Sequence, residues 1–160
     1  MYTTLISVAQ LKALQASNQA LMVFDCSYDL MKPEMADLMF AEKHMQGAQQ
    51  AHLDRHLSTH DATAVNGGRH PLPPRENLAA WLQTLGFTNT MQAVVYDRQG
   101  ANYCGRLWWM LKWLGHDAVA ILDGGLQAWE ASGGAVESGN AATPSGSVQV
   151  ESKFQLKPAL

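Results

Sequence analysis

The chain has 160 residues, of which 47% are hydrophobic and 16% charged, and its formal net charge is −3 at pH 7. This size and composition predict one soluble globular domain with a buried core. No basic run indicates a nucleic-acid partner, no apolar stretch is long enough to span a bilayer, and no signal-peptide pattern opens the chain. Two cysteines are too few for a disulfide framework, so we expect a cytoplasmic protein.

The first part of the chain predicts a capped helix followed by a buried strand. Ser7 as N-cap and Gln10 three residues later form the pattern of a capping box, and a stripe of apolar residues follows at helical spacing. The apolar run 20–24 ends at Asp25, which is typical of a strand with a polar carboxyl-terminal edge.

The middle of the chain is less regular. Residues 28–43 predict a loop and a helix, and a short strand is expected after Gly47. Residues 52–74 are polar and contain Gly67–Gly68 and three prolines, so they predict a long loop.

From residue 78 onward, helical and strand patterns alternate. The strands are uniformly apolar, as burial on both faces requires, and the alternation predicts a parallel sheet covered by helices on both sides. The predicted elements are a helix over 78–85, a strand over 93–96, a helix from about 106 to 114, a strand over 118–122 and a last helix from 126 that ends at 133.

The loop 97–102 lies between a predicted strand and a predicted helix. Free backbone N–H groups and the helix dipole converge at such a loop and form a cradle for an anion. Its first residue is Asp97, followed by Arg98 and then Gly100. Because a carboxylate repels anionic substrates, we expect Asp97 to cap the following N–H groups rather than to carry chemistry. Arg98 is expected to pair with Asp97 or to point to solvent.

Neither cysteine stands at the head of this loop. A reactive thiol needs a pKa lowered by a helix N-terminus or a nearby cation. Cys104 has Arg106 nearby and meets part of this requirement, whereas Cys26 follows the acidic Asp25. A buried, inert thiol is the expected outcome for both cysteines.

Three of the six histidines, His52, His56 and His60, recur at every fourth residue. On a helix they would share one face, as in some zinc or nickel sites. The residues after them form a poor helix and no further ligand completes a coordination shell, so we predict no metal site and no cofactor. His44 is expected to hydrogen-bond near Asp25.

Several segments together resemble the N-terminal domain of the two-domain rhodaneses, the thiosulfate and 3-mercaptopyruvate sulfurtransferases. Residues 40–48 are similar to the family signature aromatic-x-x-x-His-aliphatic-Pro-Gly-Ala, with Gln46 in place of the usual Pro and Met45 at the aliphatic position. Residues 106–109 and 122–129 are also close to patterns of that domain.

The resemblance implies an α/β, rhodanese-like fold with a central, mostly parallel five-stranded sheet and helices on both faces. It assigns residues 1–136 to a rhodanese-like domain of the inactive type and residues 137–160 to a linker toward a second, catalytic rhodanese domain. In this family the first copy has lost its catalytic cysteine, and Asp97 stands at that position. The implied function is to assist a sulfurtransferase that moves sulfane sulfur from thiosulfate or 3-mercaptopyruvate to cyanide or a thiol.

The resemblance also implies an assisting role for two residues of the long loop. Asp54 and His70 match positions that, in the mercaptopyruvate branch, act together with a serine of the second domain. The alternative is a purely structural role, in which Asp54 caps a loop and His70 is a turn residue before Pro71. Two other functions stay open: a stand-alone module that binds a small oxyanion or a protein through Arg98 and the loop N–H groups, and a single-domain sulfurtransferase that uses Cys104.

Overall fold

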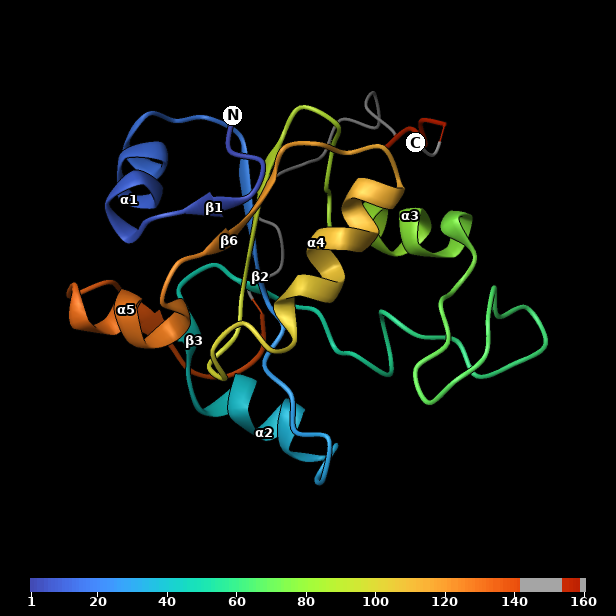
Figure 1. The fold of residues 1–160 in the computed structure, drawn as a ribbon. Helices are drawn as coiled ribbons and strands as arrows, with labels where there is room; N and C mark the ends of the chain where they lie inside the picture. Colours follow the sequence, from blue (N-terminus) through green and yellow to red (C-terminus); the bar gives the residue numbers. More distant parts are fainter. Residues whose placement is uncertain (142–153, 159–160) are drawn as a thin grey trace.

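A five-stranded parallel sheet forms the centre of the computed structural model, which describes residues 1–141 and 154–158 (Figure 1). The strand order is β1-β6-β5-β2-β4, and a separate antiparallel pair joins β3 to β7. The strands are β1 (Leu5–Ile6), β2 (Leu21–Asp25), β3 (His44–Met45), β4 (Gln49–Gln50), β5 (Gln92–Tyr96), β6 (Val119–Leu122) and β7 (Val136–Glu137).

The central strands are apolar because both of their faces are covered. Val95 and Phe24, which are paired in register, belong to the hydrophobic cluster on one face of the sheet. Val94 and Tyr96 point to the cluster on the other face, as the alternation of side chains along a strand requires. This arrangement confirms the predicted parallel sheet.

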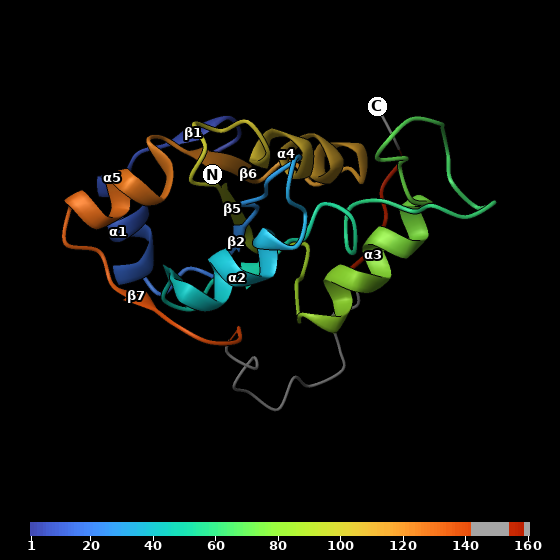
Figure 2. The same ribbon diagram turned by 90° about the horizontal axis from the view of Figure 1, so that it is seen from below.

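Two groups of helices cover the sheet, and Figure 2 shows the strands between them. Helices α1 (Val8–Ala16) and α5 (Gly125–Ala131) bury Leu11 and Trp129 on one face. Helices α3 (Arg75–Thr84) and α4 (Cys104–Trp113) bury Leu82 and Leu107 on the other face, to which α2 (Met35–Glu42) adds Ala36. The predicted α/β fold with helices on both faces is therefore confirmed.

Local signals set several element boundaries. The capping box is present, because the Ser7 side chain accepts from the Gln10 N–H and the Gln10 side chain accepts from the Ser7 N–H. Helix α4 begins at Cys104, two residues before the predicted start, because the side chain of Asp97 caps it from outside the helix. Residues 52–74 form turns and bends, as predicted.

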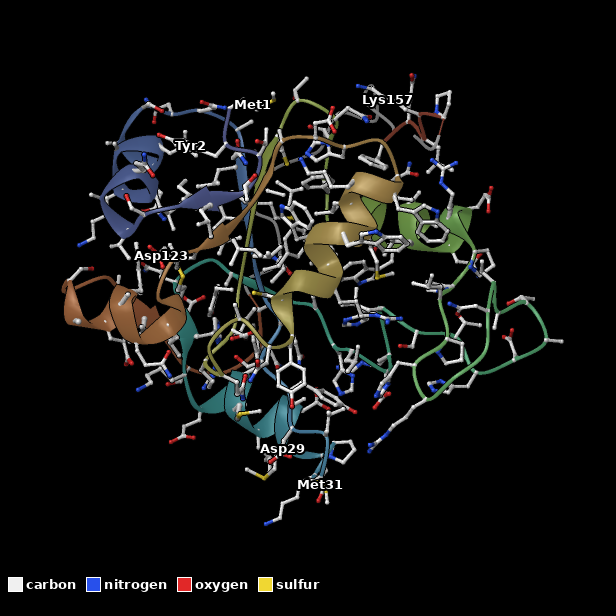
Figure 3. All side chains as sticks on the ribbon, viewed as in Figure 1. Met1, Tyr2, Asp29, Met31, Asp123 and Lys157 are labelled. Carbon is white, nitrogen blue, oxygen red and sulfur yellow. The ribbon has the colours of Figure 1, made fainter. Side chains whose placement is uncertain are left out.

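The last described residues lie against the domain. Phe154 is 6% exposed, and its ring centroid lies 5.5 Å from that of Phe87 and 6.0 Å from that of His116. The Lys157 N–H donates to the carbonyl of Leu114 at the end of α4 (Figure 3). Of the predicted linker 137–160, Glu137 belongs to β7, while 142–153 and 159–160 lie outside the described residues.

Within the described part of the chain, every helix is too short or too polar to cross a lipid bilayer.

Candidate functional site

The loop between β5 and α4 wraps around its own first residue. Asp97 is 2% exposed, and its Oδ1 accepts hydrogen bonds of 2.9 Å from the N–H groups of Gln99 and Ala101. Its Oδ2 accepts from the N–H groups of Tyr103, at 2.8 Å, and Cys104, at 2.9 Å. The carboxylate thus occupies the anion cradle that its own loop creates, which is the capping role expected from the sequence.

Two consecutive residues with positive φ curl the loop around the carboxylate. Gly100 has φ 68° and Ala101 has φ 66°, the left-handed region that glycine enters freely and alanine rarely does. Gly125 then closes the site from α5, because a Cβ there would lie 2.4 Å from the Asp97 carbonyl oxygen. The same carbonyl accepts from the Leu126 N–H at 3.2 Å. Asp97 is therefore fixed at both its side chain and its backbone.

Arg98 turns away from this cradle, and the expectation that it pairs with Asp97 or faces solvent is wrong. Its guanidinium donates to Asp25 Oδ2 at 3.0 Å, to Ser27 Oγ at 3.0 Å and to two backbone carbonyls. Asp25 is 2% exposed and ends the neighbouring strand β2, so a buried carboxylate lies within reach. Asp97 has already filled its acceptor sites with backbone N–H groups, which leaves Asp25 as the partner.

The two cysteines are buried, and their surroundings disfavour a thiolate. Burial raises the pKa of the Cys104 thiol far above its ordinary value, and the Asp97 carboxylate raises it further. Burial also raises the pKa of Cys26, with smaller contributions from Cys104 and Asp25. Both thiols are therefore protonated at neutral pH, as inert buried cysteines are.

A cavity of about 360 Å³ adjoins the loop where β6 meets α5. Asp97 and Cys104 line it from one side, and Asp123 and Gln127 line it from the other. Two carboxylates in its wall make the cavity unsuitable for an anionic substrate.

The second candidate site lies in the long loop and joins Asp54 to His70. The Nδ1 of His70 lies 2.9 Å from Asp54 Oδ1, and the Tyr28 hydroxyl donates to Asp54 Oδ2. The side chains of His70 and Asp54 are 16% and 32% exposed, so both are accessible at one edge. The structure therefore brings together the two residues that the resemblance singled out and adds a tyrosine.

Electrostatics keep this carboxylate anionic. Burial acts to raise the pKa of Asp54, but the Tyr28 hydrogen bond and the nearby His70 outweigh it, so the pKa is lowered overall. Burial and the Asp54 carboxylate raise the pKa of Tyr28 well above its usual range, so the tyrosine stays a donor. Because the carboxylate accepts at Nδ1, the Nδ1–H tautomer of His70 is favoured and Nε2 is left with a lone pair.

The Nε2 of His70 is buried and has no hydrogen-bond partner in residues 1–141 and 154–158. A neutral imidazole that donates its N–H to a carboxylate can accept a proton at the other nitrogen and later return it. The arrangement can therefore take up a proton from a group brought to it from outside.

Tyr28 is the residue that the sequence analysis did not identify. It follows β2 by three residues at the carboxyl edge of the sheet, where functional loops of parallel sheets gather. Its ring also packs edge-on against Tyr103, with centroids 5.6 Å apart. Since the Tyr103 N–H binds Asp97, this contact connects the two candidate sites.

The other histidines have separate partners. The Nδ1 of His52 accepts from two loop N–H groups at 3.2 Å, and the Nδ1 of His56 accepts from the His52 N–H at 2.9 Å. His60 lies instead beside Asp54 and His70. Within the described residues the three histidines therefore form no common ligand set.

The expectation that His44 bonds near Asp25 is wrong. Its Nδ1 lies 2.7 Å from the Phe40 carbonyl oxygen and its Nε2 lies 3.2 Å from Glu137 Oε1. The reason is that β7, which the sequence did not predict, brings Glu137 alongside β3.

Comparisons with known proteins found a matching family and similar chains. A family model described as a rhodanese-like domain matches residues 7–132. The chain is 40% identical over 142 residues to a Pseudomonas aeruginosa protein named "Probable 3-mercaptopyruvate sulfurtransferase", covering 88% of this chain and 50% of the relative. It is 33% identical over 155 residues to the human 3-mercaptopyruvate sulfurtransferase, and the match covers 95% of this chain and 49% of that relative.

A solved structure is similar over nearly the whole chain. The 3-mercaptopyruvate sulfurtransferase from Leishmania major superposes with a TM-score of 0.75 at 30% identity, and the match covers 99% of this chain and 39% of that one. The chain spans about half the length of the curated relatives named above.

Proposed function

The chain belongs to the rhodanese-like domain family, and we propose that it forms the non-catalytic first half of a two-domain sulfurtransferase. The relatives named as sulfurtransferases are about twice as long as the matched segment, which supports a second domain as the partner. In this proposal the intact enzyme takes sulfane sulfur from thiosulfate or 3-mercaptopyruvate onto a second-domain cysteine. It then passes the sulfur to cyanide or a thiol.

One observation carries the proposal, namely that the Asp97 carboxylate fills the loop in which a sulfur-carrying thiolate would lie. A persulfide needs a nucleophilic sulfur and free N–H donors that stabilise its anion. Here the loop head is an acid, and it already binds four of the loop's N–H groups. The loop therefore lacks both requirements.

The same contacts weigh against the two other functions. A stand-alone oxyanion-binding module needs the loop N–H groups and Arg98, but these are engaged by Asp97 and Asp25 respectively. A single-domain enzyme that uses Cys104 needs a thiolate, and the pKa of that buried thiol is raised.

We further propose that this half contributes Asp54 and His70 to the site of the second domain. Asp54 orients the imidazole through Nδ1, and the Nε2 of His70 moves a proton for a group that the second domain presents. An unpartnered buried nitrogen favours this role over that of a plain turn residue, because a polar atom is costly to bury without a partner.

The first test is activity of the chain by itself. Purified chain is incubated with thiosulfate and cyanide, and in parallel weighed intact by mass spectrometry after thiosulfate alone. We expect no thiocyanate above the blank and no gain of a sulfur atom. Thiocyanate formation by the pure chain, or a persulfide on Cys104 or Cys26, overturns the proposal.

The gene sequence after codon 160 gives a second, independent test. A following rhodanese repeat supports the two-domain function, and a stop codon supports the stand-alone module. In the two-domain protein, we expect Asp54→Asn and His70→Ala each to lower kcat with 3-mercaptopyruvate and to change its pH profile. Asp61→Asn, an exposed carboxylate of the same loop, serves as the matched control and leaves both unchanged.

A further inference from the structure

A third histidine stands beside the Asp54–His70 pair and has no part in the function proposed above. Asp54, His60 and His70 each offer one ligand atom, and these atoms lie within 4.8 Å of one another. Two imidazoles and a carboxylate are ligand types that zinc and neighbouring transition ions bind.

The loop holds these side chains together before any ligand arrives. The residues next to His60 and His70 are joined by a hydrogen bond of 3.0 Å from the Thr59 N–H to the Pro71 carbonyl. From α4, Arg106 donates to the His70 carbonyl at 2.8 Å and to a second carbonyl of the loop. A bound ion therefore does not need to order a flexible segment, which lowers the cost of binding.

Hydrogen bonds also set which nitrogen of each imidazole is free. The Nε2 of His60 lies 3.1 Å from the Arg69 carbonyl, which only accepts, so Nε2 carries the hydrogen and Nδ1 keeps a lone pair. The Nδ1 of His70 lies 2.9 Å from Asp54 Oδ1, so an ion that displaces the proton between them takes both atoms as ligands. His60 shares this feature with metal-binding histidines, which donate their other N–H to a carboxylate or carbonyl.

The site itself supplies one negative charge. Asp54 offers a carboxylate oxygen beside the two imidazoles, and an anionic ligand favours a divalent cation. The guanidinium of Arg69 donates to the Leu30 carbonyl at 2.6 Å and that of Arg55 pairs with Asp37 at 2.9 Å, so both groups have partners other than the three ligand residues. His60 is exposed, which gives an ion access from solvent.

We propose that Asp54, His60 and His70 form a binding site for a divalent transition-metal ion of the zinc type. Three protein ligands leave a further position for water. Mg²⁺ and Ca²⁺ do not suit this site, because these ions prefer a shell of oxygen atoms and two of the three ligands here are nitrogens. If the proposed function also holds, the ion takes the Asp54 oxygen and the His70 Nδ1 whose hydrogen bond orients the imidazole, so metal binding and assistance exclude each other.

The test is a titration of the tag-free chain in metal-free buffer. Zn²⁺ binding is followed by calorimetry and Co²⁺ binding by its visible absorption, both of which report the metal and not sulfur transfer. We expect one ion per chain, and His60→Ala and His70→Ala each weaken binding by about tenfold or more. The exposed position of His60 makes its variant safe for folding, and the circular dichroism spectrum verifies this.

A matched control separates this site from histidines elsewhere. His56→Gln removes an imidazole of the same loop but keeps a side-chain acceptor for the backbone N–H that His56 binds. Its affinity equals that of the parent if the proposal is right, and Mg²⁺ gives no signal. Parent-like affinity in His60→Ala, or an equal loss in His56→Gln, overturns the site. Either result leaves the sulfurtransferase proposal intact, since that is judged by thiocyanate formation.

Discussion

Replacing Asp97 by alanine removes the acceptor of four backbone N–H groups at once, and its cost can be worked out from the loop geometry. The side chain is 2% exposed, and all four bonds measure 2.8–2.9 Å. A buried donor left without a partner costs about 1–3 kcal/mol, and more when the lost acceptor was charged. Water from the adjoining cavity of about 360 Å³ can recover part of this loss. We therefore expect Asp97→Ala to lower the free energy of unfolding by about 3–5 kcal/mol.

Two further variants separate the lost hydrogen bonds from lost volume. Asp97→Asn keeps the shape, but its amide nitrogen faces two N–H donors and only its oxygen accepts. We expect this variant to lose about 2–4 kcal/mol. Asp123→Ala, an exposed carboxylate that lines the same cavity, stays within about 0.5 kcal/mol of the parent.

Equilibrium unfolding in urea gives these values when tryptophan fluorescence and far-ultraviolet circular dichroism are followed together. Coincident transitions justify a two-state fit and a single free energy of unfolding. If Asp97→Ala unfolds within about 0.5 kcal/mol of the parent, the carboxylate is not what holds the loop. The reasoning that the cradle is filled and structurally committed then fails.

Two other outcomes follow from the half-buried His56 and from the carboxyl-terminal segment. Burial lowers the pKa of His56 to about 4, so the unfolded chain, with a pKa near 6.5, binds more protons. The contribution of His56 to stability is therefore full above pH 6.5 and declines as the pH falls toward 4. His56→Gln reduces this decline, which is measured as the difference between the urea midpoints at pH 7 and pH 5. An unchanged pH dependence contradicts the lowered pKa of His56. Phe154→Ala removes the ring contacts with Phe87 and His116 and costs about 1–3 kcal/mol, less than a fully enclosed core Phe because the segment can detach locally. Faster hydrogen exchange at the Lys157 amide verifies this, whereas unchanged exchange and stability refute it.

The larger elements of the fold were predictable because their signal is local. Strand β5 is apolar from Ala93 to Tyr96, and α4 carries apolar residues on every turn, so burial decides both assignments. Strands β1, β3 and β7 have only two residues each and were not predicted. A segment of two residues is too short to show the alternation of apolar and polar side chains that indicates a strand. These strands form because they pair with segments far away in the chain.

The candidate site divides in the same way. Asp97 caps N–H groups two to seven residues ahead of it, so its role could be inferred from the order of residues alone. Arg98 and His44 were assigned wrong partners because their actual partners, Asp25 and Glu137, lie 73 and 93 positions away in the chain. No pattern within the sequence encodes such separations.

The pair of Asp54 and His70 shows what a family resemblance adds. These residues lie 16 positions apart in an irregular loop, and neither has a spacing that predicts contact. The resemblance named both residues, and the structure joins them at 2.9 Å. The sequence did not predict the role of Tyr28, because its hydrogen bond to Asp54 joins residues 26 positions apart.

The acid at the loop head explains how such a loop persists without a nucleophile. An empty cradle leaves several N–H groups without an acceptor, so a small neutral residue in place of a thiolate weakens the domain. A carboxylate satisfies the same donors permanently and removes the anion site in the same step. Under the proposed function, the residue that stands in place of the thiolate thus also preserves the fold. Any contribution of this domain to sulfur transfer must then come from outside the cradle, and His70, with its unpartnered Nε2, is a group positioned to make it.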